Sequence, residues 1–208
     1  MGAASKGPMN QRKPVVLVLH GPSGVGMDSV IDRLRARTGI LRATSTTSRA
    51  PRDYETDGVH YHFVSKEAFE RGIANGDFAE YALVYDQWKG LSRDEIEGPI
   101  SRGEDVIIRT DVQGARTWRN LLDHAVFVFL MAEDREALRQ RLIDRGTEDD
   151  QDLQARLDEL ESELADIPNN DHTVINRHGG LDEAVAEIEA IIERERCNPQ
   201  RPAPRLRS

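Results

Sequence analysis

Hydrophobic residues near the start of the chain form one unbroken run. Residues Pro14 to His20 read P-V-V-L-V-L-H, and such β-branched and leucine-rich runs are typical of strands buried on both faces of a parallel sheet. A glycine-rich stretch follows at Gly21–Gly26, and Asp28–Arg37 then places apolar residues at helical spacing. A strand, a glycine loop and a helix in this order open an α/β nucleotide-binding fold.

The middle of the chain has a different pattern. Residues Thr44 to Arg93 are rich in Thr, Ser, Tyr, Gly and charge, with short strand-like pieces such as Val59–Val64. This composition predicts a small α+β subdomain inserted into the sheet domain, with bounds 46–92.

The buried-strand pattern returns after the insertion. It recurs at Asp105–Arg109 (D-V-I-I-R), at Ala125–Met131 (A-V-F-V-F-L-M) and at Thr173–Asn176 (T-V-I-N). Between the last two lies a long charged helical region, Asp134–Leu164, and Leu181–Arg196 predicts a final amphipathic helix. We expect one α/β domain over residues 14–197, a flexible leader over 1–13 and a disordered tail over 198–208.

Composition narrows the possible function classes. The 208 residues suit one domain, and no run of eighteen apolar residues predicts a membrane span. The first dozen residues lack the apolar region of a secretory signal. A net charge of -9, from 37 acidic and 28 basic residues, argues against nucleic acid as a partner. The single cysteine, Cys197, excludes a disulfide scaffold and predicts the cytoplasm.

The glycine stretch carries the first candidate chemistry. Gly21 to Ser29 reads G-P-S-G-V-G-M-D-S, close to the phosphate-cradling pattern G-x-x-x-x-G-K-[ST]. Met27 stands at the lysine position, and Asp28 stands at the hydroxyl position that normally holds magnesium. The loop can therefore bind phosphate through backbone amides but without a lysine charge. A tight turn with no ligand is the alternative.

Five motifs in order resemble those of guanylate kinases. They are G-P-S-G-V-G, T-T-S-R-A-P-R at Thr46–Arg52, D-G-V-H-Y-H-F-V-S at Asp57–Ser65, D-V-Q-G at Asp111–Gly114, and R-L-I-D-R-G-T at Arg141–Thr147. The resemblance covers approximately Val15 to Glu195. It implies a three-layer P-loop fold with a parallel sheet. The expected core is 14–45, 93–134 and 157–197, the insertion 46–92 binds a nucleoside monophosphate, and a helical lid covers 135–156.

The same resemblance implies an activity and a set of site residues. The expected reaction transfers the ATP γ-phosphoryl group to GMP, dGMP or a related monophosphate. The implied acceptor residues are Ser45, Arg49, Arg52, Tyr61, Glu80 and Asp111, and the implied lid arginines are Arg141, Arg145 and Arg156. The implied donor-binding residues are Gly21, Pro22, Ser23, Gly24, Val25, Gly26, Met27, Asp28, Ser29 and Asn176.

The residues that depart from the family pattern stand at positions where the family resemblance implies contact with phosphate, metal or the guanine base. Arg109 replaces the metal-facing acid, Lys89 replaces an acceptor tyrosine, and Leu91 replaces a hydroxyl expected to read the guanine carbonyl. We hypothesise that Arg109, oriented by a salt bridge to Asp28, replaces magnesium and the loop lysine together with Lys89. Magnesium would then not be required. The competing hypothesis is that Asp28 and Asp111 hold magnesium in a new way.

Three other functions stay open from the residues. One is a non-catalytic module, like the guanylate-kinase domains of scaffold proteins that bind phosphorylated peptides. Another is a kinase acting on a phosphorylated sugar, such as ribose bisphosphate phosphokinase, whose loop also has Asp-Ser at the positions of Asp28 and Ser29. The third is an inactive kinase that only binds nucleotide. No obligate protein partner is evident.

Overall fold

The chain folds around a five-stranded parallel sheet. The computed structural model describes residues 13–134, 136–138, 160 and 162–207. The strand order is β10-β9-β1-β7-β2, and every neighbouring pair is parallel. The strands are β1 (Val16–His20), β2 (Leu41–Arg42), β7 (Val106–Arg109), β9 (Val126–Met131) and β10 (His172–Ile175). The first hydrophobic run forms the central strand, as its composition predicts.

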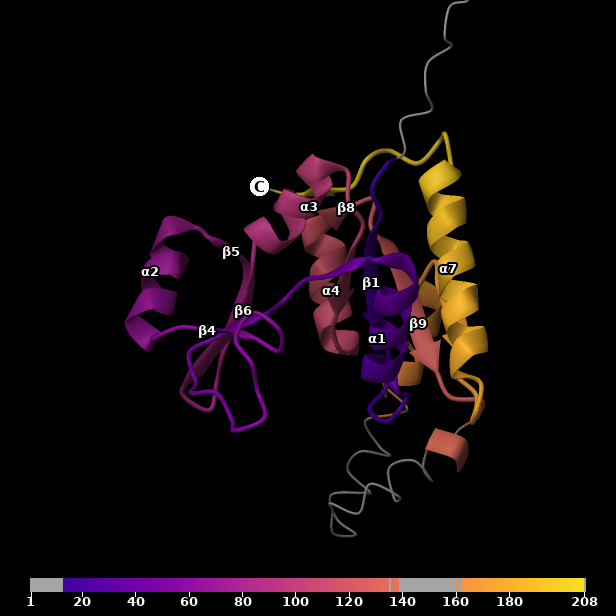
Figure 1. Ribbon diagram of the computed structural model, residues 1–208, viewed down its shortest axis with the longest axis horizontal. Coiled ribbons are helices and arrows are strands. Elements are labelled where there is room, and N and C mark those ends of the chain that lie inside the picture. Colours follow the sequence, from indigo (N-terminus) through magenta and orange to yellow (C-terminus); the bar gives the residue numbers. More distant parts are fainter. Residues whose placement is uncertain (1–12, 135, 139–159, 161, 208) are drawn as a thin grey trace, which may run out of the picture.

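Helices cover both faces of this sheet, which makes three layers (Figure 1). Leu17 and Leu19 of β1 face a cluster that includes α1 and α7, whereas Val16 and Val18 face a cluster that includes α3 and α4. Successive residues of a strand point to opposite faces, so one continuous apolar run supplies both clusters. The helices are α1 (Met27–Thr38), α3 (Asp94–Arg102), α4 (Val112–Leu121) and α7 (Leu181–Cys197), and a short 3-10 helix, η1, spans Ile167–Asn169.

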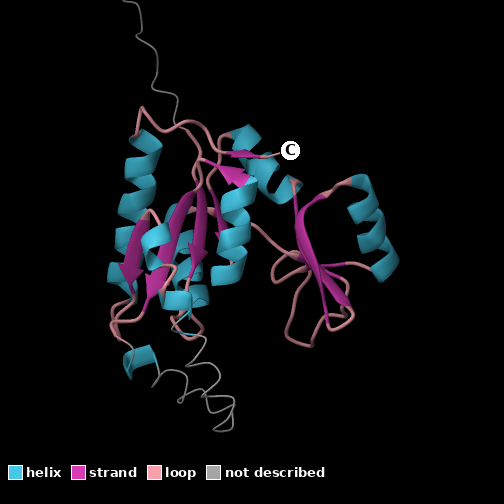
Figure 2. Ribbon diagram, turned by 180° about the vertical axis from the view of Figure 1, so that it is seen from behind, coloured by secondary structure: helices cyan, strands magenta, loops and turns pink. Residues whose placement is uncertain are grey.

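A second, smaller sheet stands beside the first (Figures 1 and 2). Its order is β4-β3-β6-β5, and helix α2 (Lys66–Asn75) packs on it through stacked rings of Phe69, Phe78 and Trp88. The strands are β3 (Thr46–Thr47), β4 (His62–Phe63), β5 (Phe78–Val84) and β6 (Gln87–Ser92). This sheet lies within the predicted insertion, between β2 and α3 of the main domain.

The C-terminal tail packs on the domain, so the prediction of a disordered tail is wrong. Strand β11 (Arg205–Leu206) pairs antiparallel with β8 (Leu122–Asp123). Arg201 is buried, and its guanidinium donates to the carbonyl of Pro14 at 2.8 Å. Arginines anchor this segment together with the buried Pro204 and with Leu206, which packs against the core. A rule based on low hydrophobicity misses the arginine contacts.

Two predicted segments fall largely outside the described residues. They are the leader 1–13, of which only Lys13 is described, and the lid 135–156, of which only residues 136–138 are described. Among the helices that the structure describes, none is both long and apolar enough to cross a membrane.

Candidate active site

The glycine loop turns tightly at the carboxyl end of β1. A side chain at Gly21 would place its Cβ 2.1 Å from the carbonyl oxygen of Leu130, so only glycine fits there. Gly26 adopts a left-handed φ of 81° and begins helix α1, where no side chain caps the helix. The first backbone N–H groups of α1 and its positive dipole end are therefore free of a side-chain acceptor, which suits an anion.

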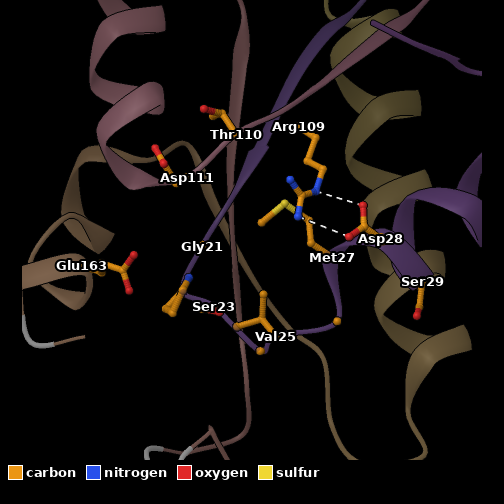
Figure 3. A pocket seen from close by; sticks show the side chains of 13 residues that line it. Gly21, Ser23, Val25, Met27, Asp28, Ser29, Arg109, Thr110, Asp111 and Glu163 are labelled. Atoms are coloured by element: carbon orange, nitrogen blue, oxygen red, sulfur yellow. Dashed lines mark hydrogen bonds and ion pairs between the residues drawn. The ribbon is translucent and has the colours of Figure 1, made fainter. Parts of the chain in front are cut away.

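The loop encloses a cavity of about 360 Å³ (Figure 3). All nine loop residues predicted to bind the donor, Gly21 to Ser29, line this cavity. The other described residues that line it are Arg109, Thr110, Asp111 and Glu163. The sheet thus brings the end of β7 and the start of α4 to the glycine loop, because the carboxyl ends of parallel strands share one edge.

Arg109 and Asp28 form the salt bridge that the sequence predicts. The Arg109 Nε lies 2.9 Å from Asp28 Oδ1, and the Nη2 lies 3.2 Å from Oδ2 (Figure 3). This pairing uses one edge of the guanidinium. One N–H of Nη1 and the second N–H of Nη2 form the other edge of the guanidinium, which can hold two oxygens of a phosphate.

Both oxygens of Asp28 are held by an arginine, which does not suit a magnesium ion at this carboxylate. Both Asp28 oxygens contact Arg109, and Asp111 Oδ1 accepts the backbone N–H of Gly114 at 2.7 Å as the cap of α4. A guanidinium already stands where a divalent cation would approach Asp28. Within the described residues, no three His, Cys, Asp or Glu side chains gather as a metal site.

Two residues predicted to bind the phosphoryl donor, Met27 and Asn176, are buried and contact other parts of the protein. Met27 is 8% exposed and belongs to the hydrophobic cluster under α1, which explains an apolar residue at this position. Asn176, predicted near the donor base, is also buried and donates from Nδ2 to the carbonyl of Val25 at 2.8 Å. Asn176 therefore holds the glycine loop in place.

A second cavity, of about 480 Å³, adjoins the first. Ser45 and Tyr61, both predicted acceptor residues, line it together with Arg42. Arg109 and Asp28 line both cavities. The salt bridge is therefore a wall that the two cavities share. We call the first the donor cavity and the second the acceptor cavity, after the ligands that the sequence predicts for their residues.

Arg49 is held beside the second cavity by Glu55, which lines it. The Arg49 Nη1 lies 2.6 Å from Glu55 Oε2, and Nη2 lies 2.5 Å from Oε1. The rings of Tyr61 and Phe63 lie 5.1 and 5.5 Å from the guanidinium carbon. These hydrogen bonds lower the pKa of Glu55 to about 2. Arg52 is exposed and donates to the Tyr54 hydroxyl at 2.8 Å.

Glu80 lies on β5 of the smaller sheet, and Asp111 caps α4 of the main domain. Burial, and then the charge of Asp111, raise the pKa of Glu80. Glu80 pairs with Leu91 in the β5–β6 register, and Leu91 is 3% exposed among core residues. The carboxylate thus has an apolar neighbour on the adjacent strand, so a ligand with N–H donors would replace the lost hydration of Glu80.

The structure does not bring every predicted residue to the cavities. Lys89 is half-buried on β6, opposite Thr47 and Ala82. The predicted residues that are described but line neither cavity are Arg49, Arg52, Glu80, Lys89 and Asn176. Arg141, Arg145 and Arg156 lie outside the described residues.

The cavity residues that sequence reasoning missed include Arg42, Glu55 and Glu163. Arg42 belongs to a strand of two residues, too short for a periodic pattern. Glu55 could have been found from its position, six residues after Arg49 in the same predicted acceptor loop.

Comparisons with known proteins identify the family of this chain. The guanylate kinase family model matches residues 11–195. A rice protein, guanylate kinase 2, chloroplastic/mitochondrial, is 43% identical over 89% of this chain, which spans 66% of the rice protein's length. The guanylate kinase of Xylella fastidiosa is 38% identical over 88% of this chain and 89% of its own. The crystal structure of guanylate kinase from Anaplasma phagocytophilum matches with a TM-score of 0.70, at 26% identity over 92% of this chain and 90% of that one. The chain therefore belongs to the guanylate kinase family.

Proposed function

We propose that this protein transfers the γ-phosphoryl group of ATP to GMP or dGMP. The observation that carries the proposal is the shared wall: the glycine-loop cavity and the acceptor cavity meet at Arg109 and Asp28. A phosphate in each cavity would converge on the same guanidinium. Relatives named guanylate kinase, at 35–43% identity, support the same acceptor.

Charge neutralisation is the main chemical task of the site. In-line phosphoryl transfer needs little covalent work from the protein and depends on positioning and on stabilising negative charge. Magnesium normally supplies part of that charge, whereas in this proposal Arg109, paired with Asp28, takes that role. In this proposal the loop amides bind the donor phosphates, and Arg109 places its free guanidinium edge against the transferring group.

In the proposal, the other predicted site residues bind the two substrates around Arg109. Arg49, Arg52 and Tyr61 bind the acceptor phosphate, and Lys89 approaches when the insertion closes on the core. Arg141, Arg145 and Arg156 grip the donor phosphates from the lid. Glu80 and Asp111 accept hydrogen bonds from the N1–H and the exocyclic amino group of guanine.

The proposed location is the cytoplasm. The chain has a single cysteine, Cys197, which is exposed, and this suits a reducing compartment. The rice relative is described as chloroplastic/mitochondrial, so an organelle is the alternative compartment for this chain. Fractionation of the source cells with antibody detection distinguishes the two.

We expect turnover with GMP and dGMP to exceed turnover with AMP, dTMP or ribose bisphosphate, and to persist in excess EDTA. The physical reason is that Arg109 supplies a fixed charge that chelation cannot remove. Direct chromatographic measurement of ADP and of the phosphorylated acceptor avoids coupling enzymes that need magnesium themselves. A magnesium-dependent kinase in the same buffer is the control and should stop.

Each result of this assay separates the alternatives. Loss of activity on chelation, restored by magnesium, would disprove metal independence and leave the kinase assignment intact. Preference for ribose bisphosphate would indicate a sugar kinase. Nucleotide binding without turnover of any acceptor would indicate a binding module or an inactive kinase.

Replacing Glu80 with glutamine is expected to raise the KM for GMP by about tenfold and to change kcat less. The wild-type KM should rise as the pH falls through the raised pKa of Glu80, because the protonated carboxyl loses its acceptor charge. The variant should lack this pH dependence. Initial rates over a pH series measure both effects, and an unchanged ranking of acceptors would remove Glu80 from the base site.

A further inference from the structure

Asp28 is approached by two arginines from neighbouring strands. Arg109 ends β7 and pairs with Asp28 at 2.9 Å, while Arg42 ends β2 and places Nη2 3.5 Å from the same Oδ1. Strands β2 and β7 are hydrogen-bonded in parallel, with Arg42 opposite Ile107. The two side chains therefore reach one carboxylate from adjacent strands at the carboxyl edge of the sheet.

The charge at this point depends on the second arginine. Arg109 and Asp28 alone form a neutral pair, which is a poor substitute for a cation. The described charged residues of the donor cavity are Asp28, Asp111, Glu163 and Arg109, three carboxylates against one guanidinium. We call Asp28, Arg109 and Arg42 the Asp28 cluster. Its one carboxylate and two guanidiniums carry one net positive charge at the wall between the two cavities.

Other charged residues that line the acceptor cavity with Arg42 do not supply this net positive charge. Asp32 and Arg35 line the acceptor cavity and are opposite in sign, and Glu55 is paired with Arg49. The Arg42 side chain is 24% exposed, against 43% for Arg109. Partial burial makes its position more defined and its charge less screened than that of an arginine in open solvent.

We propose that Arg42 is a positioning residue that offsets the charge of Asp28, so that Arg109 acts on phosphate as a full cation. This inference rests on the proposed function, in which Arg109 contacts the transferring group. Arg42 acts through Asp28 and not on the substrate. Asp28 holds one edge of Arg109, and Arg42 prevents the same carboxylate from cancelling the charge of that guanidinium.

The first test measures ATP affinity by calorimetry in excess EDTA. Arg42→Ala should weaken ATP binding about tenfold and lower kcat by a similar factor, whereas Arg42→Lys should stay within about threefold of wild type, since it keeps the charge. Arg33→Ala removes an arginine of α1 that pairs with Asp182, outside the residues lining either cavity, and should change neither value. Equal ATP affinity and kcat in Arg42→Ala and wild type would overturn the proposal.

The second test places the same change in an Asp28→Asn background. Without the carboxylate there is no charge to offset, so adding Arg42→Ala should change ATP affinity by less than about threefold. An undiminished tenfold loss in that background would show that Arg42 acts independently of Asp28, which also overturns the proposal. Calorimetry measures ATP affinity without turnover. If no variant and not even the wild type transfers phosphoryl groups, the proposed function is rejected, and the ATP affinities of the Arg42 and Asp28 variants still test the role of Arg42.

Discussion

Replacing Arg109 with alanine is expected to lower kcat about a hundredfold or more, which corresponds to about 2.7 kcal/mol of transition-state stabilisation. The variant loses the only guanidinium among the described residues of the donor cavity. It also leaves Asp28, 60% exposed, with its charge facing the site. A negative group beside a transferring phosphoryl adds repulsion to the lost attraction.

The measurement is a comparison of kcat and KM for ATP. Since Arg109 is proposed to act mainly in the transition state, kcat should fall more than the affinity for ATP. Arg109→Lys should recover part of the rate, because a point charge returns without the second edge of the guanidinium. The matched control is Arg102→Ala, which removes an exposed arginine at the end of α3 that pairs with Glu104. A kcat within about threefold of wild type in Arg109→Ala would exclude Arg109 from the chemistry.

Continuous apolar runs made the main sheet predictable. β1, β7 and β9 are buried, so their sequences contain almost no polar residues. The loop after β1 was predictable from its glycines, and at Gly21 no larger residue fits. The salt bridge was also predictable, because Asp28 and Arg109 both depart from the expected residue types. Paired departures of opposite charge indicate contact between two positions.

Features held by scattered polar contacts could not be predicted. Arg42 lies in a strand of two residues, and the tail is anchored by Arg201, which bonds Pro14 from 187 positions away. Asn176 was expected near the donor base, yet its amide bonds the loop carbonyl of Val25. Such contacts depend on the folded geometry and leave no periodic signal in the sequence.

Replacing Arg49 with alanine is expected to lower kcat/KM for GMP about a hundredfold, mostly through KM. Its guanidinium is fixed by both oxygens of Glu55 and lies over the rings of Tyr61 and Phe63, so it is positioned before any ligand binds. A positioned arginine loses little side-chain entropy when it binds a phosphate. Arg52, which is exposed and bonded to Tyr54, should cause a smaller loss when replaced.

The pH dependence separates the roles of Arg49 and Glu80. The pKa of Glu55 is lowered to about 2, so its pair with Arg49 contributes stability above the ordinary carboxyl pKa and loses it only as the pH falls through about 2. Acidification above that range should therefore weaken GMP binding through Glu80 and leave the Arg49 pair intact. Arg49→Ala should keep the wild-type pH profile at a higher KM, with ATP affinity unchanged. A flattened profile in Arg49→Ala would instead mean that Arg49 and Glu55 control the titration, and would contradict the assignment of Glu80 to the base.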